Sequence, residues 1–294
     1  MKTFLLAFVT LTLIAAPVLQ DVRGKITAGD LAGAAAYAED FRKVNGENAE
    51  YAEALSWLAR GALSFKDYKS ADQYATQTRS IVDTLLKKEK LDSSAMLRTA
   101  LGASIEVRSR VLAINGRKKQ AISELRTELS RWDGLPMKSR IQKNLNLLIM
   151  EGQPAPEIEG LAKLKGKPVL VFLWAHWCGD CKSQAVALAR VTAKYKDRGL
   201  AVIAPTRLFG STEKKSENAT VEEENAEIAR VWKELYKGLA DVLVVVSEPV
   251  MVRYGVSTTP TFALIDRKGI VRLYHPGRLA ESELERQIVK LLAR

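Results

Sequence analysis

The sequence predicts an all-helical N-terminal domain followed by an α/β domain, and two observations support this division. Residues 27–150 are rich in Ala, Leu and charged side chains and contain almost no strand-like runs. From residue 161 to residue 294, short apolar runs rich in β-branched residues alternate with segments of helical periodicity. Residues 151–160 contain two prolines, and we expect them to be the linker.

Three segments of the first half repeat a turn followed by a helix with a small residue, which is Ala34, Ala71 or Ala121. This pattern resembles helical hairpins of the tetratricopeptide type, which bind proteins. The spacings are 37 and 50 residues, whereas tetratricopeptide repeats keep a constant period of about 34. Residues 27–150 are therefore either a TPR-like domain or a plain helical bundle without a groove.

Residues 1–20 have the profile of a signal peptide, because Lys2 precedes an apolar run that only Thr10 and Thr12 interrupt. Pro17 makes the cleavage site poor, so an uncleaved N-terminal anchor is the alternative, although the run is short for a membrane span. Either interpretation places the protein in a bacterial periplasm or on the outer side of the cytoplasmic membrane. The use of only two cysteines, both in one motif, is compatible with that compartment.

Both cysteines of the chain, Cys178 and Cys181, lie in the sequence W-C-G-D-C directly after an apolar run at 169–174. The residues that follow have helical spacing, so the pair lies where a strand turns into the first turn of a helix. Unpaired N–H groups and the positive end of the helix dipole favour a thiolate there. The sequence predicts a redox dithiol in which Cys178 is the exposed nucleophile and Cys181 closes the disulfide.

An inert structural disulfide and half of a zinc site are the alternatives for these cysteines. A disulfide that closes a four-residue ring adds little stability. The chain has no second cysteine pair, and its only histidines, His176 and His275, lack the spacing of zinc ligands. We therefore expect no metal and no cofactor.

Several motifs of the second half resemble the TlpA/ResA-type extracytoplasmic branch of the thioredoxin fold, over about residues 152–294. They are W-C-x-x-C, the T-P pair at Thr259 and Pro260 ahead of a strand, the G-Q-P-A-P opening at 152–156, the L-K-G-K-P step at 164–168 and the L-I-D-R-K-G-I-V turn. The resemblance implies a thioredoxin-fold domain at 161–294. It also implies that Pro260 follows a cis peptide bond, the alternative being an ordinary trans proline that opens a strand.

The resemblance further assigns roles around the cysteines. Thr259 would place its backbone beside Cys178, and the substrate-binding residues would be Trp177, Gly179, Thr259 and Pro260. His176 and Asp180 flank Cys178 and are candidates for tuning its thiolate. His176 is equally interpretable as a solvated loop residue, and Asp180 as an acid that compensates the helix dipole.

The sequence also departs from the family pattern. Phe172 and Gln184 stand where thioredoxins and ResA-like proteins, respectively, carry a buried acid. Val186 replaces a proline that kinks the helix after the cysteines, so we expect no kink. Residues 207–209 follow a predicted strand and either line the substrate groove or pack ordinarily.

By this resemblance the protein is an extracytoplasmic thiol–disulfide oxidoreductase. Its partners would be protein disulfide or dithiol clients and an unidentified membrane or periplasmic electron donor, and the helical domain would bind protein. The alternative is a helical scaffold that carries a redox-slow thioredoxin-like domain, because the usual acid is missing. The net charge of +11 is spread over helix faces without an aromatic stripe, so we expect no nucleic acid partner.

Overall fold

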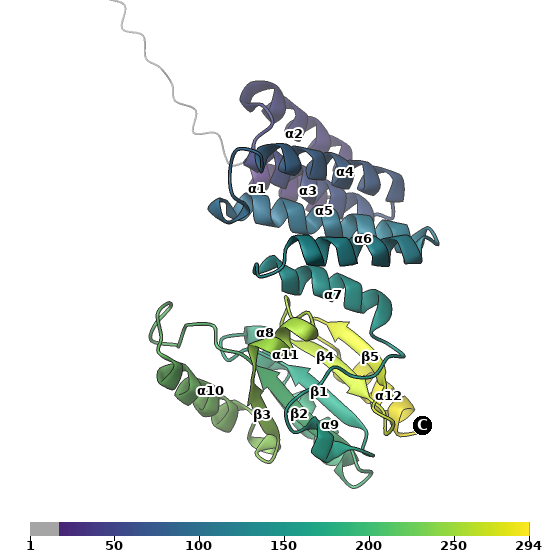
Figure 1. Ribbon diagram of the computed structural model, residues 1–294, viewed down its shortest axis with the longest axis vertical. Coiled ribbons are helices and arrows are strands. Elements are labelled where there is room, and N and C mark those ends of the chain that lie inside the picture. Colours follow the sequence, from purple (N-terminus) through teal and green to yellow (C-terminus); the bar gives the residue numbers. More distant parts are fainter. Residues whose placement is uncertain (1–17, 294) are drawn as a thin grey trace, which may run out of the picture. The chain divides into compact units, whose positions relative to one another are not determined.

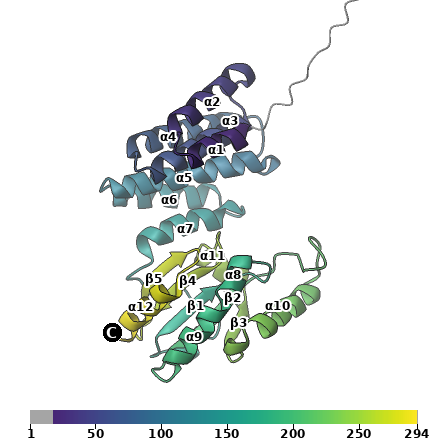
Figure 2. The same ribbon diagram turned by 180° about the vertical axis from the view of Figure 1, so that it is seen from behind.

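The computed structural model describes residues 18–293, which divide into two compact units between Val111 and Leu112 (Figures 1 and 2). Residues 1–17, most of the segment predicted as a signal peptide or anchor, lie outside the described residues. Among the helices from residue 18 onward, none combines the length and the apolar character that crossing a membrane requires.

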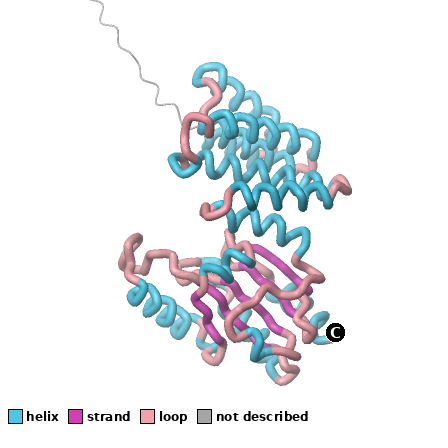
Figure 3. The backbone as a smooth tube through the Cα atoms, viewed as in Figure 1, coloured by secondary structure: helices cyan, strands magenta, loops and turns pink. Residues whose placement is uncertain are grey.

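From residue 18 onward the N-terminal unit contains helices and no strand, which confirms the expected class (Figure 3). In chain order they are α1 (Val18–Thr27), α2 (Leu31–Asn45), α3 (Ala49–Ser64), α4 (Tyr68–Leu85), the 3-10 turn η1 (Leu91–Ser93) and α5 (Ala95–Ile114), whose last residues pass into the second unit. Helix α1 packs against α2 and α3, and α3 packs against α4. Val18 and Val22 are buried in α1, so the helical unit begins before residue 27.

The repeated turns of this unit have a common cause. Asp30 and Asp67 each accept a hydrogen bond from the backbone N–H three residues later, and these bonds cap α2 and α4. The small residues of the repeats, Ala34, Ala71 and Ala121, are fully buried, as the sequence predicts for close helix packing. The third repeat, which includes α6 (Lys118–Arg131), belongs to the second unit.

The second unit contains a five-stranded mixed sheet of order β3-β2-β1-β4-β5, which confirms the expected α/β class. Strand β1 pairs in parallel with β2 and antiparallel with β4; β2 pairs in parallel with β3, and β4 antiparallel with β5. The elements after α6 are α7 (Met137–Ile149), η2 (Leu161–Leu164), β1 (Val169–Leu173), α8 (Gly179–Ser183), α9 (Ala185–Lys196), β2 (Ala201–Thr206), α10 (Val221–Leu235), η3 (Lys237–Leu239), β3 (Leu243–Val246), α11 (Glu248–Arg253), β4 (Thr261–Ile265), β5 (Val271–Pro276) and α12 (Glu281–Leu292).

The central strand β1 is buried on both faces, as expected for its continuous apolar run. Leu170 and Phe172 point into a core layer shared with α9, α10 and α12. Val169, Val171 and Leu173 point into the opposite layer, which contains Val250 and Met251 of α11. The sheet is therefore covered on both faces. The residues that follow β1 leave the sheet at the carboxyl end of this central strand.

Helix α7 belongs to the second unit, because it packs against α11 and β5. The side-chain amide of Asn146 donates to the carbonyl of Arg253 at 3.1 Å, and the Tyr274 N–H donates to Glu151 Oε1 at 3.1 Å. The compact units thus divide within α5, whereas the sequence suggests a linker at 151–160. The domain limits at residues 150 and 161 stay a prediction.

Candidate redox site

The loop that carries the cysteines is tied to the end of β2 by Trp174, the first residue after β1. Its backbone N–H donates to the carbonyl of Pro205 at 3.1 Å, and its indole N–H donates to that of Ala204 at 3.3 Å. The Thr206 hydroxyl donates to the Trp174 carbonyl at 2.8 Å. Because these groups are buried and mutually satisfied, the loop leaves the sheet in a fixed direction.

Cys178 is the residue that begins the helix after this loop. Its Sγ accepts a hydrogen bond from the Cys181 N–H at 3.1 Å and so caps α8. The same sulfur lies 3.4 Å from the Thr259 carbonyl, to which its S–H donates. Both cysteines are free thiols. A sulfur that faces a helix N-terminal N–H is in a position that stabilises a thiolate.

Both cysteines are nonetheless buried. Cys178 is 4% exposed and Cys181 is 0% exposed, so the prediction of an openly exposed Cys178 is wrong in extent, because the Thr259 carbonyl lies against its sulfur. The order of exposure still places Cys178 nearer the surface. Burial raises the pKa of the Cys181 thiol well above its ordinary value, and the neighbouring Cys178 sulfur adds a smaller effect in the same direction.

The Thr259–Pro260 peptide bond is cis, so the trans alternative is wrong. The carbonyl of Pro260 accepts a hydrogen bond from the Gly277 N–H at 2.8 Å, which ties this turn to the end of β5. Two other residues with a predicted substrate role lie next to Cys178 in the chain: Trp177, which is 54% exposed, and Gly179, whose missing side chain would meet open space. The structure thus gathers the cysteines and the four predicted substrate residues around one sulfur.

Asp180 lies in the first turn of α8 and points to solvent. Its carboxylate is 3.8 Å from the guanidinium of Arg278, and both side chains are 61% exposed. An ion pair this exposed contributes little energy, because water screens it. The structure therefore agrees better with helix-dipole compensation than with strong tuning of the thiolate.

His176 is buried, with 2% exposure, so its interpretation as a solvated loop residue is wrong. Its Nε2 lies 3.0 Å from the carbonyl oxygen of Ser211, and its Nδ1 lies 3.7 Å from Oε1 of Glu224. Burial lowers the pKa of His176 below its ordinary value, and this outweighs the opposing effect of Glu224. The ring is therefore neutral at pH 7 and is not a cation that favours a thiolate on Cys178.

Glu224 is the site residue that the sequence analysis missed. Its carboxylate is 1% exposed and accepts hydrogen bonds from the backbone N–H groups of Phe209 at 2.6 Å and Gly210 at 2.8 Å. A sequence signal existed: Glu224 lies four residues before Ile228, on the apolar face of α10 that is buried in the core. An acid on the buried face of an amphipathic helix needs buried donors, and here they come from residues 209 and 210.

The segment after β2 reaches the redox loop. The ring of Phe209 contacts that of Trp177 edge-on, at 5.3 Å between centroids and 87° between planes. The guanidinium of Arg207 lies 4.7 Å from the Phe209 ring and pairs with Glu248 at 2.8 Å. Residues 207–209 are therefore neighbours of the loop that holds Cys178, which favours the groove-lining alternative.

The positions of the missing acids are filled without ionisable groups. Phe172 packs its ring against Phe262 and Tyr236, at 5.4 and 5.9 Å between centroids. The Gln184 side-chain oxygen accepts from the Leu279 N–H at 3.1 Å. Gln184 also interrupts the helix between α8 and α9, because its N–H bonds three residues back, to Cys181. The helix after the cysteines is thus divided at Gln184 although no proline is present, and the expected absence of the proline kink stays a prediction.

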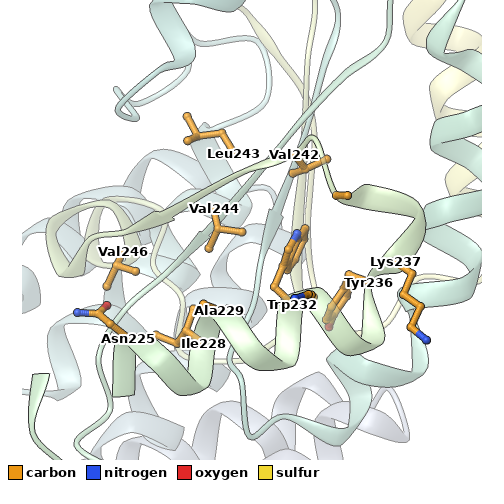
Figure 4. A pocket seen from close by; sticks show the side chains of 12 residues that line it. Asn225, Ile228, Ala229, Trp232, Tyr236, Lys237, Val242, Leu243, Val244 and Val246 are labelled. Atoms are coloured by element: carbon orange, nitrogen blue, oxygen red, sulfur yellow. The ribbon is translucent and has the colours of Figure 1, made fainter. Parts of the chain in front are cut away.

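A hollow of about 530 Å³ lies between α10 and β3, and neither cysteine lines it (Figure 4). Its lining is mostly apolar and includes Trp232, Tyr236 and Val244, and the buried Tyr236 hydroxyl has no hydrogen-bond partner. It contains no cysteine or histidine, so the dithiol is the better candidate for chemistry. Within residues 18–293, no group of three or more His, Cys, Asp or Glu side chains is placed to hold a metal ion.

Comparison with known proteins agrees with this choice. Residues 156–288 match the family described as Redoxin. Thioredoxin-like protein YneN of Bacillus subtilis (strain 168) is 28% identical over 149 residues, 48% of this chain and 79% of that protein. Thiol:disulfide interchange protein DsbE of Xylella fastidiosa (strain 9a5c) is 28% identical over 174 residues, 57% of this chain and 77% of its own. Thiol-disulfide oxidoreductase ResA of Bacillus anthracis is 25% identical over 155 residues, 52% and 80% of the two chains.

Proposed function

We propose that this chain, a TlpA/ResA-like thiol–disulfide oxidoreductase of the thioredoxin fold, exchanges disulfides with protein clients through Cys178 and Cys181. The observation that carries this proposal is the position of one sulfur. Cys178 Sγ lies between the Cys181 N–H, which stabilises a thiolate, and the Thr259 carbonyl next to the cis peptide bond.

The reaction consists of two exchange steps. The Cys178 thiolate attacks a client disulfide, forms a mixed disulfide with one client sulfur and releases the other as a thiolate. Cys181 then loses its proton and attacks Cys178 Sγ, which closes the Cys178–Cys181 disulfide and releases the second client thiol. Two electrons pass from the protein to the client, and the same steps in reverse oxidise a client dithiol.

The burial of Cys181 supports this division of roles. Because burial raises the pKa of Cys181, its sulfur stays a thiol while Cys178 makes the first attack. Cys181 lies one helical turn after Cys178, and its backbone N–H already contacts the Cys178 sulfur. It is therefore in reach of that sulfur for the second step.

The client would bind as an extended segment along the Thr259–Pro260 turn. The Thr259 carbonyl that faces Cys178 would lie beside the client backbone, while Trp177 and Gly179, the neighbours of Cys178 in the chain, offer exposed surface. Main-chain pairing of this kind gives affinity without a fixed client sequence.

We further propose that the protein works outside the cytoplasm, in a bacterial periplasm or attached to the membrane. This rests on the signal-peptide profile of residues 1–20 and on the restriction of cysteine to one motif. A membrane or periplasmic donor would restore the dithiol, and the helical unit would bind a protein partner.

Trapping of a mixed disulfide tests the proposal. Cys181→Ala, expressed in the native cell envelope, should accumulate a disulfide-linked complex that reducing agent dissolves. The matched variant Cys178→Ala should give no such complex, because it lacks the attacking sulfur. Absence of complexes with Cys181→Ala, or equal amounts with both variants, would favour the alternative of a redox-slow scaffold. The burial of Cys181 and the apolar Phe172 at the position of the usual acid are the observations that support this alternative.

A further inference from the structure

Two buried side chains, His176 of the redox loop and Glu224 of α10, hold residues 207–220, here called the 207–220 segment. The Ser211 carbonyl can only accept a hydrogen bond, so the His176 Nε2 that lies 3.0 Å away carries the hydrogen. The Glu224 carboxylate accepts the N–H groups of Phe209 and Gly210. His176 stands two residues before Cys178, so the segment is anchored to the redox loop.

The bonds to Glu224 fix the backbone of Phe209 in particular. The carboxylate is withdrawn from water, so competition from solvent is small. The backbone of Phe209 is therefore held in one position, although this residue lies between β2 and a long polar segment.

The ring of Phe209 completes an aromatic surface beside the dithiol. It meets the ring of Trp177, the residue directly before Cys178, in an edge-to-face contact at 5.3 Å. Trp177 is 54% exposed and Phe209 is half-buried. We call these two rings the aromatic platform.

Two charged side chains close to the platform in space or in sequence have partners of opposite charge. Arg207 lies over the Phe209 ring but pairs with Glu248. Asp180, two residues after Cys178, faces Arg278 at 3.8 Å. A client side chain on the platform would therefore meet apolar ring surface, and this favours an uncharged apolar group.

From this geometry we propose that Phe209 is a specificity-determining residue of the redox reaction. With Trp177 it binds an aliphatic or aromatic client side chain next to the reacting client cysteine. Glu224 and His176 act as positioning residues, because they hold the backbone that carries Phe209. This inference rests on the proposed function and deepens it by naming the class of client sequence.

The test uses two short peptides whose single cysteine is disulfide-linked to 2-mercaptoethanol. One peptide has Phe before the cysteine and the other has Ser. The reduced full-length protein should convert each mixed disulfide into peptide thiol and 2-mercaptoethanol while its own dithiol becomes a disulfide. Chromatography of the peptide thiol, with the reduced protein in excess, gives the second-order rate constant of this single turnover for each peptide, and the Phe/Ser ratio of these constants is the specificity.

An aromatic contact predicts a Phe/Ser ratio of about three to ten for the wild-type protein. Phe209→Ala should bring this ratio close to one, and Phe209→Leu, which keeps apolar bulk, should give an intermediate value. Phe65→Ala, which removes an exposed phenylalanine of the helical unit, should keep the wild-type ratio. Glu224→Gln should also lower the ratio, because it weakens the two hydrogen bonds that hold the backbone of Phe209.

A wild-type ratio near one, or an unchanged ratio in both Phe209 variants, would overturn the inference. Equal slowing of both peptides by Glu224→Gln would mean that Glu224 only stabilises the fold. If the wild-type protein reduced neither peptide, the proposed function itself would fail, and that result is distinct from a missing preference.

Discussion

Alkylation of the reduced protein at pH 7 should modify Cys178 far faster than Cys181, although both side chains are buried. Only the thiolate reacts with an alkylating agent. The Cys178 sulfur faces the Cys181 N–H at 3.1 Å and keeps 4% exposure. Cys181 has no exposed surface, and burial raises its pKa, so it forms a thiolate only at high pH.

The size of the difference follows from the ionisation. Each unit by which a thiol pKa rises lowers its thiolate fraction at neutral pH about tenfold. Because the pKa of Cys181 is raised strongly and its sulfur is closed to solvent, the labelling rates should differ on the order of 100-fold or more. Raising the pH should speed up labelling of Cys181 into the strongly alkaline range, because burial raises its pKa.

A time course with iodoacetamide, followed by fragment-ion mass spectrometry of the tryptic peptide that contains both cysteines, measures both rates in one sample. Protein unfolded in guanidinium is the control, and its two cysteines should react at rates within about twofold of each other, because unfolding removes the difference in burial. Faster labelling of Cys181 in the folded protein, or equal rates, would refute the assignment of Cys178 as the attacking residue.

Three further predictions concern stability. A fragment of residues 112–294 should melt at a higher temperature than one of residues 152–294, because only the longer one keeps α7 on the sheet; equal melting temperatures would contradict this. Below about pH 6.5, the free energy of unfolding should fall more steeply with falling pH for the wild-type protein than for His176→Gln. The reason is that a histidine whose pKa is lowered in the folded state binds its proton more readily in the unfolded state; parallel pH profiles of the two proteins in urea unfolding would contradict this prediction. Tyr236→Phe should leave the free energy of unfolding unchanged or raise it by up to about 1 kcal/mol, because the lost hydroxyl has no partner; a clear loss of stability would show that the hydroxyl is bonded.

Local sequence patterns were sufficient to predict the fold class and the position of the dithiol. A continuous apolar run predicts β1, helical spacing predicts the helix after it, and the cysteines lie between the two. The cis peptide before Pro260 followed from a family resemblance, since nothing in the local pattern alone requires it.

The surroundings of the dithiol could not be predicted, because they depend on contacts between segments that are distant in the chain. The buried His176 ring lies against Phe209, Ser211 and Glu224, which all follow it by more than 30 residues in the chain. Glutamate is a residue type that usually lies at the surface. Only the place of Glu224 on the buried face of α10 shows its role. The low exposure of Cys178 likewise depends on Thr259, which lies 81 residues later in the chain, shortly before β4.

Reduction of insulin by the purified full-length protein tests the central claim most directly. With dithiothreitol as the electron source at pH 7, the wild-type protein should shorten the time before the released insulin B chain precipitates, because the Cys178 thiolate opens the insulin disulfides. Cys178→Ala should precipitate insulin no faster than dithiothreitol alone. A wild-type protein that gives no acceleration, or a Cys178→Ala variant that matches it, would contradict the account of a thiol–disulfide oxidoreductase that works through Cys178.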